Sequence, residues 1–233
     1  MRFLTLRRIL PFAILLLGLG AFFALGLNRH LSLQSLSRNE AEITSWVAAH
    51  RVLAMLTFFA AHTTVVAFSL PAGVAMTAAS GFLFGVWQGA ILSMTGTTTG
   101  SIILFFAARS AFYDFFRARA GAAIARLEQG VRRDGVSYLV FLRVVPGFPG
   151  WVVTIVTALL GMRPIVFIAG TVIGILPGSF VFAGIGADFG VLFRSGETPD
   201  LGAIFQARTL LPMLGLGVLA LLPVLYRRWQ HRS

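Results

Sequence analysis

The chain reads VLAMLTFFAAHTTVVAFSLPAGVAMTAASGFLFGVWQGAILSMTGTTTGSIILFFAA over residues 52–108, and none of these 57 side chains carries a formal charge. A continuous helix of that length would measure about 85 Å, nearly three times the ~30 Å hydrocarbon core of a bilayer. Four residues interrupt the stretch after one crossing: Pro71, Gly73, Gly81 and Gly85. The sequence therefore predicts a transmembrane helix over residues 52–70, a broken segment, and a second transmembrane helix over residues 88–109.

The composition of the whole chain is that of an integral membrane protein. Of its 233 residues, 57% are hydrophobic and only 12% are charged, and the mean hydropathy is +0.86. Soluble domains carry about 25% charged residues. Three further uncharged runs are long enough to cross a bilayer: residues 9–27, 164–187 and 209–226. We therefore expect five transmembrane helices. The first is expected to be retained, because no convincing signal-peptide cleavage pattern follows it.

The basic residues are all arginine, 19 in number, and the net charge is +11. They flank apolar segments and form no groove, which predicts anchors at the membrane surface and no nucleic-acid partner. Cysteine is absent, so the chain has neither disulfides nor thiolate metal sites. We expect no metal and no cofactor.

A second apolar segment, residues 138–162, also contains helix-breaking residues. They are Arg143, Pro146, Gly147, Pro149 and Gly150. Broken helix at membrane depth occurs only where it is buried in protein or lines a water-filled cavity. Both broken segments are therefore predicted to be re-entrant hairpins, over Pro71–Gly85 and Val140–Gly161. Each precedes a glycine-spaced helix, and such paired interruptions are typical of inverted repeats with a binding site near the midplane.

The predicted fold is an all-α integral membrane protein with about five transmembrane helices and two opposed re-entrant hairpins in an inverted repeat. Residues 1–50 would hold a transmembrane helix and an interfacial amphipathic helix, residues 51–190 the core, and residues 191–233 a loop and the last transmembrane helix. The charged segment 110–135 is predicted to be a helical linker outside the membrane. Arginine favours the cytoplasmic side, so linker and C-terminus are placed there, in a multi-pass protein of the plasma (inner) membrane. The arginine-rich N-terminus conflicts with that placement.

Two motifs resemble the DedA-like superfamily, also called the VTT-domain or SNARE-associated Golgi protein family, and in particular its Tvp-type branch. In the first half the residues are Gly81-Phe82-Leu83-Phe84-Gly85, followed by Gly96, Gly100, Phe105 and Arg109. In the second half they are Phe141-Leu142-Arg143-Val144-Val145-Pro146-Gly147-Phe148-Pro149 and Gly174-Ile175-Leu176-Pro177-Gly178. The resemblance covers about half the chain. It implies two opposed re-entrant loops and the flipping or scrambling of phospholipids or polyprenyl-phosphate carriers, in some members dependent on the proton-motive force.

The chain departs from the family pattern in two places. Members often have a carboxylate in or before the first hairpin, whereas residues 52–108 contain no Asp or Glu. The Tvp-type branch usually has asparagines after the second proline, where this chain has Trp151 and Thr154. The first departure bears on proton coupling and the second on head-group specificity.

Two arginines are the candidate substrate-binding residues. Arg143 lies inside an apolar hairpin, where an isolated charge costs at least a few kcal/mol and needs a partner or water. Its planar guanidinium is suited to a phosphate, but snorkelling to the interface would also explain it. Arg109 ends an apolar helix, where snorkelling alone would be enough, and the family resemblance is what implies a functional role for it.

Other candidates would shape the site or move protons. The site-shaping set is Pro146, Pro149, Gly81, Gly85, Gly174, Pro177 and Gly178. The prolines are expected to break helices and to turn helix ends toward an anion. Possible proton-coupling residues are His62, which packing or a hydrogen bond would equally explain, and Asp188, which a solvated helix end would equally explain. The threonines at 95 and 97–99 either bond back to their own helix or line a polar path.

The most favoured function is a membrane transporter for phosphate-bearing lipids, with membrane lipids as partners. An enzyme is not expected. An intramembrane protease needs a serine nucleophile with a histidine on a second span, for which His62 is the only candidate, and no Gly-x-Ser-Gly motif occurs. Paired aspartates for a metal do not occur either. A non-transporting protein of membrane organisation or trafficking is the alternative, although it would not need broken helices at membrane depth. Assembly into a homo-oligomer is compatible with the sequence.

Overall fold

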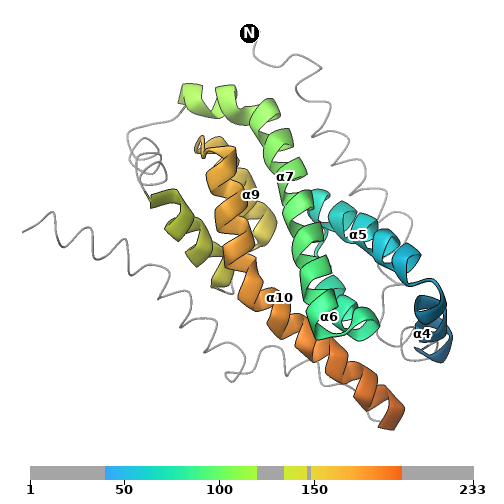
Figure 1. The fold of residues 1–233 in the computed structure, drawn as a ribbon. Helices are drawn as coiled ribbons and strands as arrows, with labels where there is room; N and C mark the ends of the chain where they lie inside the picture. Colours follow the sequence, from blue (N-terminus) through green and yellow to red (C-terminus); the bar gives the residue numbers. More distant parts are fainter. Residues whose placement is uncertain (1–39, 120–133, 146–147, 196–233) are drawn as a thin grey trace, which may run out of the picture. The chain divides into compact units, whose positions relative to one another are not determined.

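The computed structural model describes residues 40–119, 134–145 and 148–195. Every regular element in these ranges is a helix, so the predicted all-α class holds for the described part of the chain (Figure 1). Three predictions lie outside it: the transmembrane helices over residues 9–27 and 209–226, and Pro146 as a site-shaping residue. The predicted linker over 110–135 is described only in part.

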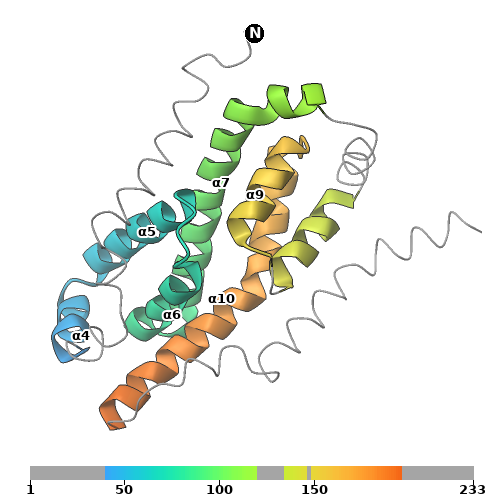
Figure 2. The same cartoon turned by 180° about the vertical axis from the view of Figure 1, so that it is seen from behind.

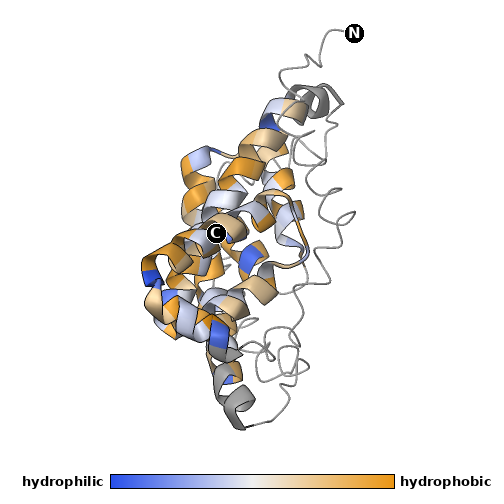
Figure 3. Cartoon of the chain, turned by 90° about the vertical axis from the view of Figure 1, so that its right-hand side faces the viewer, coloured by the Kyte–Doolittle hydropathy of each residue, from blue (hydrophilic) through white to orange (hydrophobic). Residues whose placement is uncertain are grey.

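Two described helices are long and apolar enough to cross a membrane. They are Val86–Ala111 within α7 (Val86–Arg119) and Pro164–Phe189 within α10 (Pro164–Ser195). Both contain the predicted spans and extend them by a few residues. Figure 3 shows apolar colours over most of the described helices, with only scattered hydrophilic positions. The two spans are therefore uninterrupted where the sequence predicts them to be.

The predicted span over residues 52–70 is a shorter helix in the structure. Helix α5 (Arg51–Ala67) has 17 residues, about 25 Å, which is short of the ~30 Å hydrocarbon core. It follows α4 (Glu40–Ala49) after a bend of 110° at His50. Only if this bent pair is one span does the described part hold a third crossing. After α5 the chain turns through Ser69, which has the positive φ of 59°.

The first broken segment contributes one helix instead of a complete hairpin. Helix α6 spans Gly73–Phe84, so its 12 residues measure about 18 Å and cannot cross a bilayer. Gly81, which was expected to interrupt the segment, lies inside α6, because its missing side chain is used for packing. Gly85 does end the helix, with the left-handed φ of 78° that glycine adopts without strain. The turn of this hairpin therefore lies between α5 and α6.

In the second broken segment a helix lies on each side of the break. Residues 134–144 are helical, and after the break α9 begins at Gly150 and ends at Leu159. A turn with Gly161 at φ 71° leads into α10. Pro177 corrects a prediction, since it lies inside α10 and does not end it. A proline within a helix removes one backbone hydrogen bond, but the apolar residues on both sides keep the helix continuous.

The chain divides into two compact units, whose boundaries cut α7 after Gly100 and α10 after Gly178. Among the described residues, the α6 unit comprises 40–100 and 179–195, and the α9 unit comprises 101–119, 134–145 and 148–178. Along the chain the same order of elements occurs twice: a helical arm, a break, a short helix, a left-handed glycine and a long helix. A repeat is thus present in the order of elements.

The α6 unit is held together by close backbone approach. A Cβ atom at Gly81 would collide with the backbone of Ala183 on α10, and one at Gly186 with the backbone of Ala78 on α6. Figures 1 and 2 both show α6 beside the first turns of α7. There the buried hydroxyl groups of Thr77 and Ser93 are 2.7 Å apart. Glycine and hydroxyl contacts of this kind are typical of helix packing in membranes.

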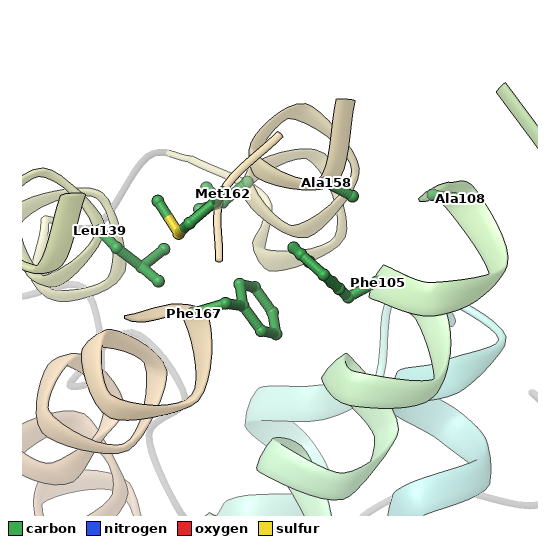
Figure 4. Packing of buried hydrophobic residues seen from close by; sticks show 7 residues of the cluster. Phe105, Ala108, Leu139, Ala158, Met162 and Phe167 are labelled. Carbon is green, nitrogen blue, oxygen red and sulfur yellow. The ribbon is translucent and has the colours of Figure 1, made fainter. Parts of the chain in front are cut away.

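The α9 unit has a larger apolar core. Its buried members are Phe105, Ala108, Leu139, Val153, Ala158, Met162 and Phe167. They come from α7, the arm over residues 134–144, α9, the turn after it, and α10, so each element of the unit contributes to the core (Figure 4). The rings of Phe105 and Phe167 stack at its centre, with centroids 4.4 Å apart and planes 26° apart.

Candidate anion-binding site

Arg143 lies at the end of the arm over residues 134–144, and its guanidinium contacts only neutral acceptors among the described residues. Nη2 donates to Oγ1 of Thr154, 2.9 Å away, and lies 3.5 Å from Oγ1 of Thr171. Nη1 lies 3.4 Å from the carbonyl oxygen of Gly150, a weak contact. The guanidinium carbon is 5.8 Å from the ring centroid of Phe167. The cation is therefore held by hydroxyls, a carbonyl and an aromatic face.

The positive charge of Arg143 has no carboxylate partner within the described ranges. Its Nε is buried and lacks a hydrogen-bond acceptor there. The one acid described on the same arm, Asp134, is nine residues earlier, about 13 Å along the helix. Removing one partner from a buried charge is strongly destabilising, so a cation held without a counter-ion favours an anionic ligand.

Glycines of α10 bring the arm close enough for these contacts. A Cβ atom at Gly174 would lie 2.6 Å from Cβ of Arg143 and 3.2 Å from Cα of Val140. One turn earlier, a Cβ atom at Gly170 would lie 3.0 Å from the side chain of Leu139. Only glycine fits at position 174, which was predicted to shape the site. The approach it permits places the Arg143 side chain beside Thr171 of α10.

The start of α9 adds a second source of positive potential. Pro149, another predicted site-shaping residue, is the N-cap of α9, and no side chain caps the helix there. The backbone N–H groups of Val152 and Val153 both donate to the Pro149 carbonyl oxygen, at 2.9 and 3.2 Å. The N-terminus of a helix carries about half a positive charge and favours anions. Arg143 and this helix start therefore both favour a negative group beside Gly150.

Arg109 has a different set of contacts in the same unit. Its Nη1 donates to the carbonyl oxygen of Met162, 2.9 Å away, which ties α7 to the turn between α9 and α10. Its guanidinium carbon lies 5.9 Å from the Phe105 ring centroid and 5.5 Å from that of Tyr113. No described contact joins Arg109 directly to Arg143. The two arginines instead lie over opposite members of the stacked pair Phe105–Phe167.

His62, predicted as a possible proton-coupling residue, is fully buried in the α6 unit. Its Nε2 is 3.1 Å from Oγ1 of Thr97, and its ring meets that of Phe58 edge-on at 5.7 Å. Nδ1 is buried without a hydrogen-bond partner in the described part. Gly96 packs against it, since a Cβ atom there would lie 3.2 Å from Cβ of His62. The packing explanation accounts for most of these contacts.

Three remaining predictions are located as follows. Asp188 is exposed on α10, which continues to Ser195, so it does not mark a helix end. Gly178 is half-buried inside α10, next to Pro177. The threonine cluster mostly bonds back to its own helix. The acceptors are the carbonyl oxygens of Ile91 and Leu92 for Thr95, Met94 for Thr98, and Thr95 for Thr99.

Sequence reasoning missed Thr171 and Phe167 and noted Thr154 only as a departure from a family pattern. A signal for Thr171 was present. The pattern Gly-Thr-x-x-Gly occurs twice, over residues 96–100 and 170–174, and each threonine meets a nitrogen-bearing side chain of the preceding arm. In the first copy that side chain is His62, and in the second it is Arg143.

The match to a known domain agrees with this architecture. A model of the VTT domain matches residues 70–188, half of the chain, and the chain belongs to the VTT-domain family. It is a membrane protein similar to the Transmembrane protein 41 homolog of Dictyostelium discoideum, with 29% identity over 181 residues. It is also similar to Transmembrane protein 41B of Gallus gallus and of Homo sapiens, each with 24% identity over 181 residues.

These alignments take in 76% of this chain but only 52%, 65% and 60%, respectively, of the three relatives. The chain thus spans little more than half the length of the curated relatives that it matches. No solved structure matches it.

Proposed function

We propose that this chain moves phosphate-bearing lipids across the plasma membrane, as a flippase or scramblase, and that Arg143 binds the lipid phosphate. The observation that carries the proposal is a cation at a helix break whose described partners are all neutral. A phosphate would supply the missing negative charge and would accept hydrogen bonds from the guanidinium N–H groups that have no close acceptor. Neither chemistry on the lipid nor a metal is part of the proposal, so the chain is proposed to be a transporter and not an enzyme.

The two terminal nitrogens of the Arg143 guanidinium have different contacts. Nη2 is held by Thr154 and lies near Thr171, so the side chain is fixed before a lipid arrives. Nη1 has only the long contact to the Gly150 carbonyl and is free to donate to a phosphate oxygen. The lipid tails would stay in the bilayer while the head group passes the break. A direct phosphate contact by Arg109 stays a prediction.

The test is transport by Arg143 variants of the full chain in proteoliposomes, with a fluorescent phospholipid in one leaflet and matched protein levels. Arg143→Ala should slow transport by about 10- to 100-fold, the rate equivalent of one charge-assisted hydrogen bond. The transport rate of Arg143→Lys should lie between those of the wild type and Arg143→Ala, because a single ammonium nitrogen cannot bind the threonines and the phosphate at once.

The matched control is Arg163→Ala, since Arg163 is an exposed arginine in the turn before α10. It should transport lipid at the wild-type rate. Wild-type rates for both Arg143 variants would exclude phosphate binding by Arg143. A chain that scrambles no lipid at all would favour the alternative role in membrane organisation or trafficking.

A further inference from the structure

Gly150 is exposed, and its carbonyl oxygen lies 3.4 Å from Nη1 of Arg143. A Cβ atom built there would lie 3.1 Å from Nη1 of Arg143. Apart from the chain neighbours Pro149 and Trp151 and the nearby backbone of α9, no other heavy atom of the described residues would come within 4 Å of that Cβ. The space in front of Nη1 is therefore open in this direction because position 150 has no side chain.

That open space is the place where a ligand oxygen would lie. A phosphate oxygen bonded to a guanidinium nitrogen lies about 2.7–2.9 Å from it. A Cβ atom 3.1 Å from Nη1 would take up part of the space around that nitrogen in which such an oxygen has to lie. A methyl group at residue 150 would therefore narrow the approach of a phosphate oxygen to Nη1.

The other nitrogens of the guanidinium offer no equal alternative. Nη2 faces Thr154 and Thr171, which are both fully buried. Nε is itself buried. A ligand that reaches Arg143 without displacing protein must therefore reach Nη1, and it would do so at the uncapped start of α9.

We propose that Gly150 is the access position of the site: its missing side chain admits one oxygen of a lipid phosphate to Nη1 of Arg143. This inference rests on the proposed function. It makes Gly150 a specificity-determining residue that contributes no charge and no hydrogen bond of its own side chain. Size at position 150, and not only charge at position 143, would then decide whether a phosphate binds.

The proposal predicts opposite effects on stability and transport. Alanine favours a helix over glycine, so Gly150→Ala at the start of α9 should leave the thermal midpoint of the protein unchanged or raise it. Transport should nevertheless fall by at least about tenfold, because the bound oxygen loses its place. A glycine with only a structural role would change both quantities in the same direction.

The experiment compares three variants of the full chain in vesicles of phosphatidylcholine and phosphatidylglycerol, with a trace of fluorescent phosphatidylglycerol in one leaflet. The control is Gly184→Ala, since Gly184 also has nothing within 4 Å of a built Cβ, and it should transport normally. Arg143→Ala is the reference for loss of the site. Thermal midpoints of all three are measured in detergent.

Each outcome decides between the two proposals. Loss of transport in Gly150→Ala and Arg143→Ala, with normal transport in Gly184→Ala, supports both. Loss in Arg143→Ala with wild-type transport in Gly150→Ala overturns the access role alone. Wild-type transport in Arg143→Ala overturns the proposed function and the access role with it. A fall in the thermal midpoint of Gly150→Ala that matches its loss of transport would also overturn the access role.

Discussion

The α6 unit and the α9 unit use one packing device with different side chains. In each, a helical arm meets a Gly-Thr-x-x-Gly segment of the following long helix, and a nitrogen-bearing side chain of the arm lies beside the threonine. In the α6 unit this is His62, whose Nε2 lies beside Thr97 and whose buried Nδ1 has no hydrogen-bond partner among the described residues. In the α9 unit it is Arg143, a cation with neutral partners. A similar contact between an arm and a long helix therefore holds a histidine in one unit and a cation without a described counter-ion in the other.

We call the contact between the arm and the long helix of each unit a joint. The two joints also differ in how closely the arm approaches the glycines of the long helix. Gly174 is in contact with Arg143 itself, whereas its counterpart Gly100 faces Thr63, Val66 and Ala67 and not the histidine. His62 instead faces Gly96. The polar residue thus occupies different positions on the two arms. If the α9 joint alone binds lipid, matched substitutions in the two joints should separate stability from transport.

The largest difference is expected for the glycines beside the two polar residues. Gly174→Ala would place a Cβ atom 2.6 Å from Cβ of Arg143, and Gly96→Ala would place one 3.2 Å from Cβ of His62. The first should lower stability by about 1–3 kcal/mol and displace the guanidinium, slowing transport by as much as ~100-fold. The second needs a shift of only a few tenths of an ångström, so its transport should stay near the wild-type rate.

Both variants are compared by leaflet-resolved transport and by thermal midpoint. Equal loss of transport in the two, at equal stability, would mean that the joints contribute alike and that Arg143 has no separate role.

A smaller difference is expected for the two threonines. Thr171→Val removes a hydroxyl near Nη2 of Arg143 and should slow transport by about threefold, because the cation is then held less firmly. Thr97→Val leaves Nε2 of His62 without its partner and should cost about 1 kcal/mol of stability with little effect on transport. Both variants are again compared by leaflet-resolved transport and by thermal midpoint. A larger transport defect in Thr97→Val than in Thr171→Val would place lipid binding in the α6 unit instead of the α9 unit.

The smallest effect is expected from removal of the proton gradient. Residues 52–108 contain no carboxylate, and His62 is enclosed and hydrogen-bonded. Lipid transport should therefore continue when an uncoupler collapses the gradient, and His62→Gln, which keeps a donor and an acceptor, should change the rate by less than about twofold. Complete loss of transport under the uncoupler would mean that transport depends on the proton gradient, with His62 and Asp188 as the candidate proton-coupling residues.

The sequence was sufficient to predict the helical class, the two uninterrupted long helices and the break around Pro149, because glycine, proline and charge act locally on the backbone. It was not sufficient at Pro177 and Gly81. Whether a helix tolerates such a residue depends on its neighbours in space, and Gly81 is required by the backbone of Ala183. Within the predicted span over 52–70 the helix ends at Ala67, and hydropathy does not reveal the turn through Ser69 that follows it.

The candidate site was predicted only in its most polar member. An arginine in an apolar segment is conspicuous because its charge is costly there, so Arg143 could be selected from the sequence. The residues that hold it could not. Thr154 and Thr171 are ordinary helix residues until the arm, α9 and α10 are brought together, and Gly150 matters only through the space it leaves.

The stacked pair Phe105–Phe167 has a consequence for how substitutions combine. Arg143 lies over the ring of Phe167 and Arg109 over the ring of Phe105, and each cation is attracted to the electrons of its ring. Because the two rings stack on each other, a change at one arginine also affects the ring beneath the other. The free-energy effects of replacing the two arginines should then not add, although no described bond joins them. Replacing either phenylalanine by leucine would remove that coupling, and the two arginine substitutions would become independent of each other.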